Sequence, residues 1–137
     1  MSFDLFALEQ QILDRLEPLK GEIPLAGTFG QIDVTDSSAS AVAANVVFGS
    51  FAPVSQVGAS ALHHVAWTFD LYVDVGRATQ AQKTAAAALF SNALQELIGW
   101  EFSRGREVRT AEGRSSGYDG RVLRISFGFI IPVLLAG

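Results

Sequence analysis

A stretch of alternating side chains, from His63 to Val75, restricts the possible folds more than any other feature of the sequence. Apolar residues such as Val65, Trp67 and Phe69 occupy every second position, and mostly polar residues lie between them. This period of two is typical of a β-strand with one buried face. At roughly 3.3 Å per residue such a strand is about 40 Å long, which is long for a small domain. We therefore expect one of its ends to project as a hairpin.

Two segments have the spacing of amphipathic helices. In the segment Asp4–Leu19, leucine and isoleucine recur every three or four positions until Pro18 ends the pattern. The second helix is predicted for Thr79–Trp100. It begins with a capping box, in which the Thr79 hydroxyl accepts a backbone N–H and the Gln82 side chain reaches back.

The remaining patterns predict strands and turns. The expected strands are Ala41–Phe51, His63–Val75, Arg104–Glu112 and Tyr118–Pro132. Gly49 predicts a bulge or an edge position in the first of them. Residues 21–41 have the composition of loops, with room for a short strand at Gln31–Val34. A hairpin loop is predicted at Ser55–Ala61 and a turn at Gly113–Gly117.

The order of these elements defines the expected fold class. It is helix, strand, strand, helix, strand, strand, with no internal repeat and no linker. We predict an α+β fold in a single domain, residues 1–137. It consists of an antiparallel β-sheet of four to five strands with two α-helices packed on one face.

Composition limits the class of protein further. Hydrophobic residues make up 49% of the 137 residues and charged residues only 18%, below the usual value of about 25%. A small monomer cannot easily bury so much apolar surface, so we expect a homo-oligomer. There is no cysteine, the start of the chain lacks a basic secretory segment, and the longest apolar run, Phe127–Gly137, is too short to span a bilayer. These features favour a cytosolic protein, or an assembly made in the cytosol.

Charge is distributed unevenly along the chain. Residues 1–75 contain nine acidic and two basic residues, whereas residues 76–137 contain five acidic and eight basic residues. The net charge of −4 argues against general affinity for nucleic acid. Six arginines between Arg104 and Arg124 lie among acidic residues, which favours salt bridges between subunits over nucleic-acid recognition.

The sequence contains no arrangement of residues typical of an enzyme. Gly113–Gly117 matches the G-x-S-x-G pattern, but a strand rather than a helix is predicted to follow it. His63 and His64 are adjacent on a strand and point to opposite faces, which does not suit a shared metal ion. Trp67 and Trp100 fit core packing better than ligand stacking. We therefore predict no catalytic residue, metal or cofactor.

Three segments give the chain a resemblance to a known family. Residues 3–16, FDLFALEQQILDRL, resemble the first helix of bacteriophage tail terminator (tail completion) proteins, which include minor tail proteins of Mu-like phages. The strand at residues 67–75, WTFDLYVDV, followed directly by an alanine-rich helix, is similar to the same family, as is the long final strand at Arg121–Pro132. The resemblance extends over nearly the whole chain through element order and hydrophobic pattern, except for residues 24–45.

The resemblance implies a structural role in a virion, assembled in the host cytoplasm. Such proteins form a ring, usually of six subunits, that caps the tail tube, ends its polymerisation and joins the tail to the neck proteins of the head. DNA passes through the lumen without specific binding, and an acidic lumen suits that passage. Family members act through interfaces, so the resemblance supplies no catalytic residue.

Candidate contact residues follow from charge, apolar character and position. For contacts between subunits we predict Phe6, Leu13, Asp70, Asp74, Arg106, Arg109 and Arg124. For docking to the tube or neck we predict the loops Ser55–Ala61 and Gly113–Tyr118, with Ser55, Gln56, Gly58, Arg114, Ser115, Ser116 and Tyr118.

Two other classes of protein remain compatible with the sequence. One is a different neck or tail component, such as a head-closure (stopper) protein or a tube protein. The other is a small ligand-binding or enzymatic α+β oligomer, which requires a concave pocket with convergent polar groups.

Overall fold

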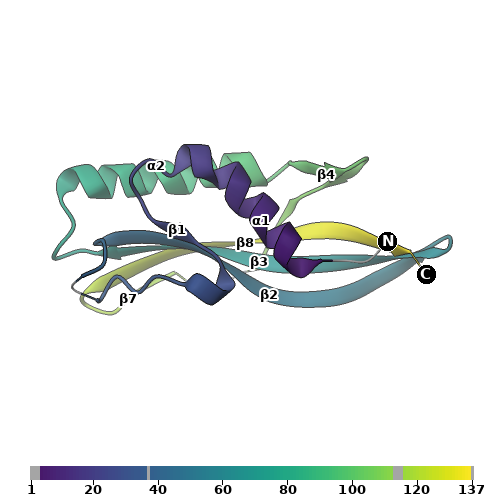
Figure 1. Cartoon of the computed structure of the whole chain (residues 1–137), viewed down its shortest axis with the longest axis horizontal. Helices are drawn as coiled ribbons and strands as arrows, with labels where there is room; N and C mark the ends of the chain where they lie inside the picture. Colours follow the sequence, from purple (N-terminus) through teal and green to yellow (C-terminus); the bar gives the residue numbers. More distant parts are fainter. Residues whose placement is uncertain (1–3, 37, 113–115, 137) are drawn as a thin grey trace.

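The chain folds into a long twisted sheet with two helices on one of its faces (Figure 1). The structure is a computed structural model that describes residues 4–36, 38–112 and 116–136. The helices are α1 (Leu5–Leu16) and α2 (Gln80–Leu97), and the 3-10 turns are η1 (Glu17–Leu19) and η2 (Thr28–Gly30). The strands are β1 (Leu25–Ala26), β2 (Val42–Val57), β3 (Ser60–Asp74), β4 (Glu101–Ser103), β5 (Arg106–Glu107), β6 (Arg109–Ala111), β7 (Gly117–Tyr118) and β8 (Val122–Ala136).

The main sheet has six strands in the order β1-β2-β3-β8-β6, with β7 paired to the first part of β8. β1 runs parallel to β2, and the other pairs of this sheet are antiparallel. β4 and β5 form a separate small hairpin. The predicted α+β class with two helices on one face is confirmed. The sheet differs from the prediction because it includes a parallel strand and more short strands at its edges.

Local signals fix both helices. Asp4 caps α1, and its carboxylate accepts the backbone N–H groups of Phe6 and Ala7 at 3.0 and 3.1 Å. The capping box of α2 is confirmed, because Thr79 Oγ1 accepts from the Gln82 N–H while Gln82 Oε1 accepts from the Thr79 N–H. α2 ends at Leu97 rather than Trp100, since Gly99 adopts a left-handed conformation with φ of 89°.

The core lies between the helices and the sheet. Its fully buried large side chains come from both helices, β2, β3 and β8: Ile12, Leu16, Val42, Val46, Trp67, Phe69, Leu71, Leu89, Leu97, Phe129 and Ile131. Phe127 stacks on Phe69 with ring centroids 5.2 Å apart and meets Phe90 of α2 edge-on at 5.4 Å. Burial of each such side chain stabilises the fold by about 1.5–3 kcal/mol. Trp67 is part of the core, as predicted.

The β2–β3 hairpin is longer than predicted. Pairing continues to Val57 and Ser60, so the expected loop at Ser55–Ala61 is wrong. Only Gly58 and Ala59 form the turn, and Gly58 supplies the positive φ of 59° that a tight turn favours. The predicted irregularity at Gly49 is confirmed by a register shift between Phe48 and Ser50.

One end of the sheet extends beyond both helices, at the right of Figure 1. It consists of the hairpin Gly49–His64 and the end of β8, Pro132–Ala136, and we call it the projecting sheet. Its three strands pair with one another through β3. The expectation that one end of the long strand projects is confirmed.

Residues 31–34 do not form the short strand that the sequence allowed at this position. The buried side chain of Asn45 holds this segment instead: its Oδ1 accepts the Ile32 N–H at 3.0 Å, and its Nδ2 donates to the Ile32 carbonyl at 3.3 Å. A side-chain amide therefore replaces the backbone ladder beside β2. The parallel strand forms earlier in the chain, at Leu25–Ala26.

The two strands predicted near the end of the chain are divided. The segment 104–112 contains the β4–β5 turn, where Gly105 has φ of 73°, and then β6. Tyr118 belongs to β7, and the long strand begins only at Val122 because Asp119 forms a turn. The Asp119 carboxylate accepts the backbone N–H groups of Arg121 and Val122 at 2.9 and 2.7 Å. β8 then continues past Pro132 to Ala136.

Candidate interaction surfaces

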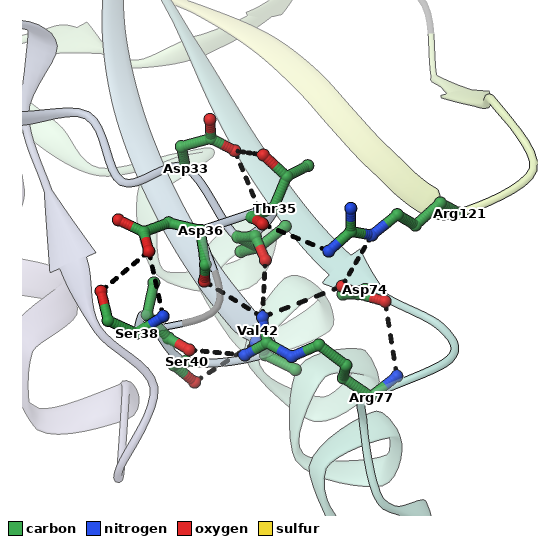
Figure 2. A network of polar contacts seen from close by, with 11 residues as sticks. Asp33, Thr35, Asp36, Ser38, Ser40, Val42, Asp74, Arg77 and Arg121 are labelled. Carbon is green, nitrogen blue, oxygen red and sulfur yellow. Dashed lines mark hydrogen bonds and ion pairs between the residues drawn. The ribbon is translucent and has the colours of Figure 1, made fainter.

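Asp74 lies at the centre of a polar network at the end of β3 (Figure 2). Its buried carboxylate accepts a charge-assisted hydrogen bond from Arg121 Nε at 3.1 Å and one from the Arg77 backbone N–H at 3.4 Å. The Arg77 guanidinium is 3.9 Å from the same carboxylate. Asp74 is thus enclosed by its own chain, and we no longer assign it to a contact between subunits.

The same two arginines hold residues 33–36 and 38–40 at the end of the sheet (Figure 2). Arg77 donates to the carbonyls of Val34 at 3.0 Å and Asp36 at 3.1 Å, and also to that of Ala39. Arg121 donates to the carbonyl of Thr35 at 3.2 Å. These contacts give a segment with little regular structure a fixed place beside β3 and β8.

Exposed carboxylates with lowered pKa values lie along this segment and beside it. The Thr35 hydroxyl and backbone N–H hold the pKa of Asp33 below its usual range, and the Ser38 N–H and hydroxyl do the same for the pKa of Asp36. The backbone N–H groups of the next turn lower the pKa of Asp119. A shallow hollow of about 310 Å³ lies here, lined in part by Asp33, Asn45, Tyr72 and Asp119. The surface around it is negatively charged.

Asp70 is also internal to the chain. It is buried on the sheet face opposite the helices, and its Oδ1 accepts a hydrogen bond of 2.6 Å from the Ser126 hydroxyl of β8. A buried carboxylate held in this way is not available to a neighbouring subunit. The prediction that Asp70 forms an intersubunit contact is therefore corrected.

Phe6 is the most exposed of the predicted apolar contact residues. It is 64% exposed at the start of α1 and lies beside Phe29, which is 79% exposed, with ring centroids 5.6 Å apart. Glu9 anchors the segment that carries Phe29, because its carboxylate accepts from both the N–H and the hydroxyl of Thr28 at 2.9 and 2.6 Å. Leu13, by contrast, is half-buried and packs against the core. Phe29 was not predicted as a contact residue, because the sequence around it has no periodic pattern.

The predicted contact arginines lie toward the other edge of the sheet. Arg106 on β5 is half-buried and Arg109 on β6 is exposed, and both line a hollow of about 210 Å³ with His64 and Pro132. Arg124 on β8 is half-buried. Their role between subunits remains a prediction.

The residues predicted for docking have different positions in the fold. Ser55 and Gln56 are exposed residues of β2, and only Gly58 lies in a turn. Tyr118 on β7 is exposed, and Ser116 accepts the Ser126 N–H through its hydroxyl at 3.0 Å. Arg114 and Ser115 lie outside the described residues. Docking through these residues remains a prediction.

The strands of the projecting sheet carry apolar side chains and no charged ones, and Arg106, Glu107 and Arg109 line a hollow beside them. Its exposed large side chains include Phe51, Val54 and Leu134, of which Val54 is 50% and Leu134 41% exposed. Residues 37–69 and 125–137 contain no Asp, Glu, Lys or Arg. This surface was not predicted from sequence, because Ser55–Ala61 has the composition of a polar loop. The absence of charge over 33 consecutive residues, 37–69, was the available signal.

Two histidines and a tryptophan lie at positions that do not suit ligand chemistry. His63 stacks on Phe51 with ring centroids 4.7 Å apart, while His64 lines the hollow beside Arg106. Trp100 lies under the Arg15 guanidinium, which is 4.4 Å from its ring centroid.

In residues 4–36, 38–112 and 116–136, no group of three or more potential ligand side chains is placed to hold a metal ion. The helices of this part of the chain include none that is long and apolar enough to cross a membrane.

Comparison with known proteins gives a structural similarity only. No family model and no curated protein matches the chain. The fold is similar to that of a chain from the virion of a native gene transfer agent (GTA) particle, with a TM-score of 0.56 and 15% identity over 90% of this chain and 92% of that one. A second solved structure is 18% identical over 96% of this chain and 96% of that one, and its TM-score is only 0.47. The first similarity shows a shared fold over nearly the full length of both chains.

Proposed function

We propose that this chain is a structural protein of a virion. The observation that carries the proposal is the fold shared with a chain of the GTA virion over nine-tenths of both lengths. The exposed, uncharged projecting sheet supports it, because an apolar surface of this kind is typical of a protein that works through contacts with other proteins. A role in assembly also accounts for the surplus of apolar residues.

Within the virion, we propose the role of tail terminator. In this role the chain forms a ring that caps the tail tube, ends tube polymerisation and joins the tail to the head-closure and neck proteins. DNA passes through the lumen without specific binding. The resemblance of α1, of β3 with α2, and of β8 to this family supports the role. We propose assembly in the host cytoplasm, with no catalytic function and no cofactor.

Strand edges on both sides of the sheet also support a ring. A heterologous contact, in which two different surfaces of the same chain meet, closes into a ring when the rotation fits and otherwise gives a filament. The part of β2 that extends beyond its pairing with β1 and the edge carrying β6 are two such surfaces. A tube protein has the same requirement, so it is the alternative that the experiment must separate.

The test combines native mass spectrometry with negative-stain images of the purified protein. Closed rings of about six copies, or monomers that form rings only at tube ends, are expected. Open filaments that grow with concentration would indicate a tube protein instead. A stable monomer or dimer that forms no ring and does not bind tubes would contradict the virion role and favour a small ligand-binding module.

A second measurement tests capping directly. Purified tube protein is allowed to polymerise with and without this chain, and tube lengths are measured. A terminator is expected to shorten the tubes and to appear at one end of each. Unchanged lengths in the presence of rings would leave a neck protein as the better assignment.

A further inference from the structure

The projecting sheet has two edges without a neighbouring strand. On β2, the backbone from Gly49 to Val57 pairs, among the described strands, with β3 alone. On β8, pairing with the outer strands ends at Ile130, so Ile131–Ala136 also pairs with β3 only among the described residues. Such edges favour association with another strand. Each edge carries one proline, Pro53 on β2 and Pro132 on β8, which has no backbone N–H to donate to a neighbouring strand. We therefore expect side-chain packing to contribute more than backbone hydrogen bonds to a contact at these edges.

The absence of charge restricts what can cover this surface. The three strand segments contain no Asp, Glu, Lys or Arg, and their titratable side chains are His63 and His64. The nearest charged side chains, Arg106, Glu107 and Arg109, line the hollow beside Val54 and Pro132. Along the strand segments themselves, a partner that buried its own charged residues would lose their hydration without gaining an ion pair. The matching partner is therefore another uncharged, apolar edge. This chain itself offers two of them.

The register of the sheet places the two edges at the same height. Ser55 on β2 pairs with Leu62 on β3, and Leu62 pairs with Leu134 on β8. Ser55 and Leu134 thus lie level with each other on opposite sides of the projecting sheet. Rotation about a ring axis keeps every residue at its height along that axis. If the strands follow the axis, Ser55 of one copy faces Leu134 of the next.

We propose that the projecting sheets of neighbouring copies join edge to edge, with the β2 edge of one copy packed against the end of β8 in the next. The occupant of each edge is a second copy of this chain, and the contacts are made by the segments around Val54 and Leu134. The projecting sheets together form an uncharged collar at one end of the ring. This inference rests on the proposed ring.

Cross-linking tests the contact without disturbing the fold. The natural chain has no cysteine, so Ser55→Cys and Leu134→Cys each introduce a single thiol. A mixture of the two variants, treated with a short bismaleimide, is expected to give covalent dimers, whereas each variant alone gives none. Asn92→Cys, on the exposed side of α2, mixed with Ser55→Cys is the matched control and is expected to give no product.

The doubly substituted chain gives a sharper result. Carrying both thiols, it is expected to form a ladder of covalent oligomers that stops at the subunit number of the ring. Ser55 and Leu134 of one chain are about 10 Å apart across β3, so links within a chain also form, but they leave the product at the mass of a monomer and do not extend the ladder. Dimers formed by Ser55→Cys alone would indicate a symmetric β2–β2 contact and would overturn the proposal. Rings in which no mixture cross-links would overturn it as well.

Introducing a charged residue measures how much the apolar surface of the projecting sheet contributes to ring formation. Val54→Asp and Leu134→Asp change exposed side chains, so both variants are expected to fold, with unchanged helical circular dichroism. Burying the new carboxylate is expected to weaken ring formation roughly tenfold or more. Asn92→Asp adds the same charge on α2 and is expected to leave the rings intact.

The outcomes separate this inference from the proposed function. If the wild-type chain forms no ring, alone or on tubes, the proposed function fails. If wild-type rings form and Val54→Asp rings remain intact, only the edge contact is overturned. If the Val54→Asp rings are intact but no longer cap tubes, the projecting sheet binds the tube protein rather than a second copy.

Discussion

Arg121 and Asp74 join the start of β8 to the end of β3 through a hydrogen bond of 3.1 Å from Nε to the carboxylate. The carboxylate is buried, whereas about half of the arginine side chain remains in contact with solvent. Arg77 approaches the same carboxylate from the turn before α2. The two arginines also hold residues 33–36 and 38–40, so one acidic side chain organises this end of the sheet.

Removal of that carboxylate is expected to destabilise the fold. Asp74→Ala leaves the Arg77 backbone N–H without its side-chain acceptor and removes the buried partner of Arg121. We expect the free energy of unfolding to fall by about 2 kcal/mol, since the solvent-exposed part of Arg121 reduces the effect. Urea denaturation measures it. Asp14→Ala, on the exposed face of α1, is the control, and equal effects of the two substitutions would contradict the assigned role.

The capping box of α2 gives a second test. Thr79→Ala removes the hydroxyl that accepts the Gln82 N–H at 3.1 Å. A cap of this kind contributes about 1 kcal/mol, so the thermal midpoint is expected to fall by several degrees. Thr84→Ala, on the exposed surface inside the same helix, is expected to be neutral or slightly stabilising because alanine favours helix. A neutral Thr79→Ala would show that packing alone defines the start of α2.

The turn carboxylates make stability depend on pH. The pKa values of Asp33, Asp36 and Asp119 are lower in the folded chain than in the unfolded one. Their contribution is therefore complete above the unfolded value of about 3.9 and is lost as the pH falls through the folded values. We expect the urea midpoint to fall on acidification below about pH 4.

Substitution of the same residues identifies the source of that dependence. Asp33→Asn with Asp119→Asn is expected to flatten the acid branch of the profile, whereas Asp14→Asn is expected to preserve it. An acid branch that is identical in all variants would assign the dependence to other carboxylates.

The aromatic pair Phe6 and Phe29 separates assembly from stability. Both side chains are mainly exposed, so Phe6→Ser and Phe29→Ser are expected to change the free energy of unfolding by at most about 0.5–1 kcal/mol. If the pair lies between subunits, the concentration needed for ring formation is expected to rise roughly tenfold. Analytical ultracentrifugation measures it. Leu89→Ala in the core is the contrasting variant, with an expected loss of about 2–5 kcal/mol. Rings that are unaffected by both serine substitutions would remove Phe6 from the interface.

Elements with strong local signals were predictable from sequence. The apolar stripe defines α1, the capping box defines the start of α2, and the alternation from His63 to Val75 defines most of β3. In each case the determining residues are within a few positions of one another. The α+β class follows from their order. Residues 21–41 carry no such signal. The short strand in this region forms at Leu25–Ala26 rather than at Gln31–Val34.

The tertiary structure alone decided the roles of the buried carboxylates and the extent of the projecting sheet. Asp70 and Asp74 are polar positions on an alternating strand, which predicts exposure. Their partners, Ser126 and Arg121, are 56 and 47 residues away in the chain. Likewise, the pairing of β2 with β3 extends through residues with the composition of a loop, because cross-strand hydrogen bonds and a two-residue turn outweigh local preference. Sequence determines structure locally through periodicity and caps, whereas contacts between distant segments decide which polar groups are enclosed and which edges stay open.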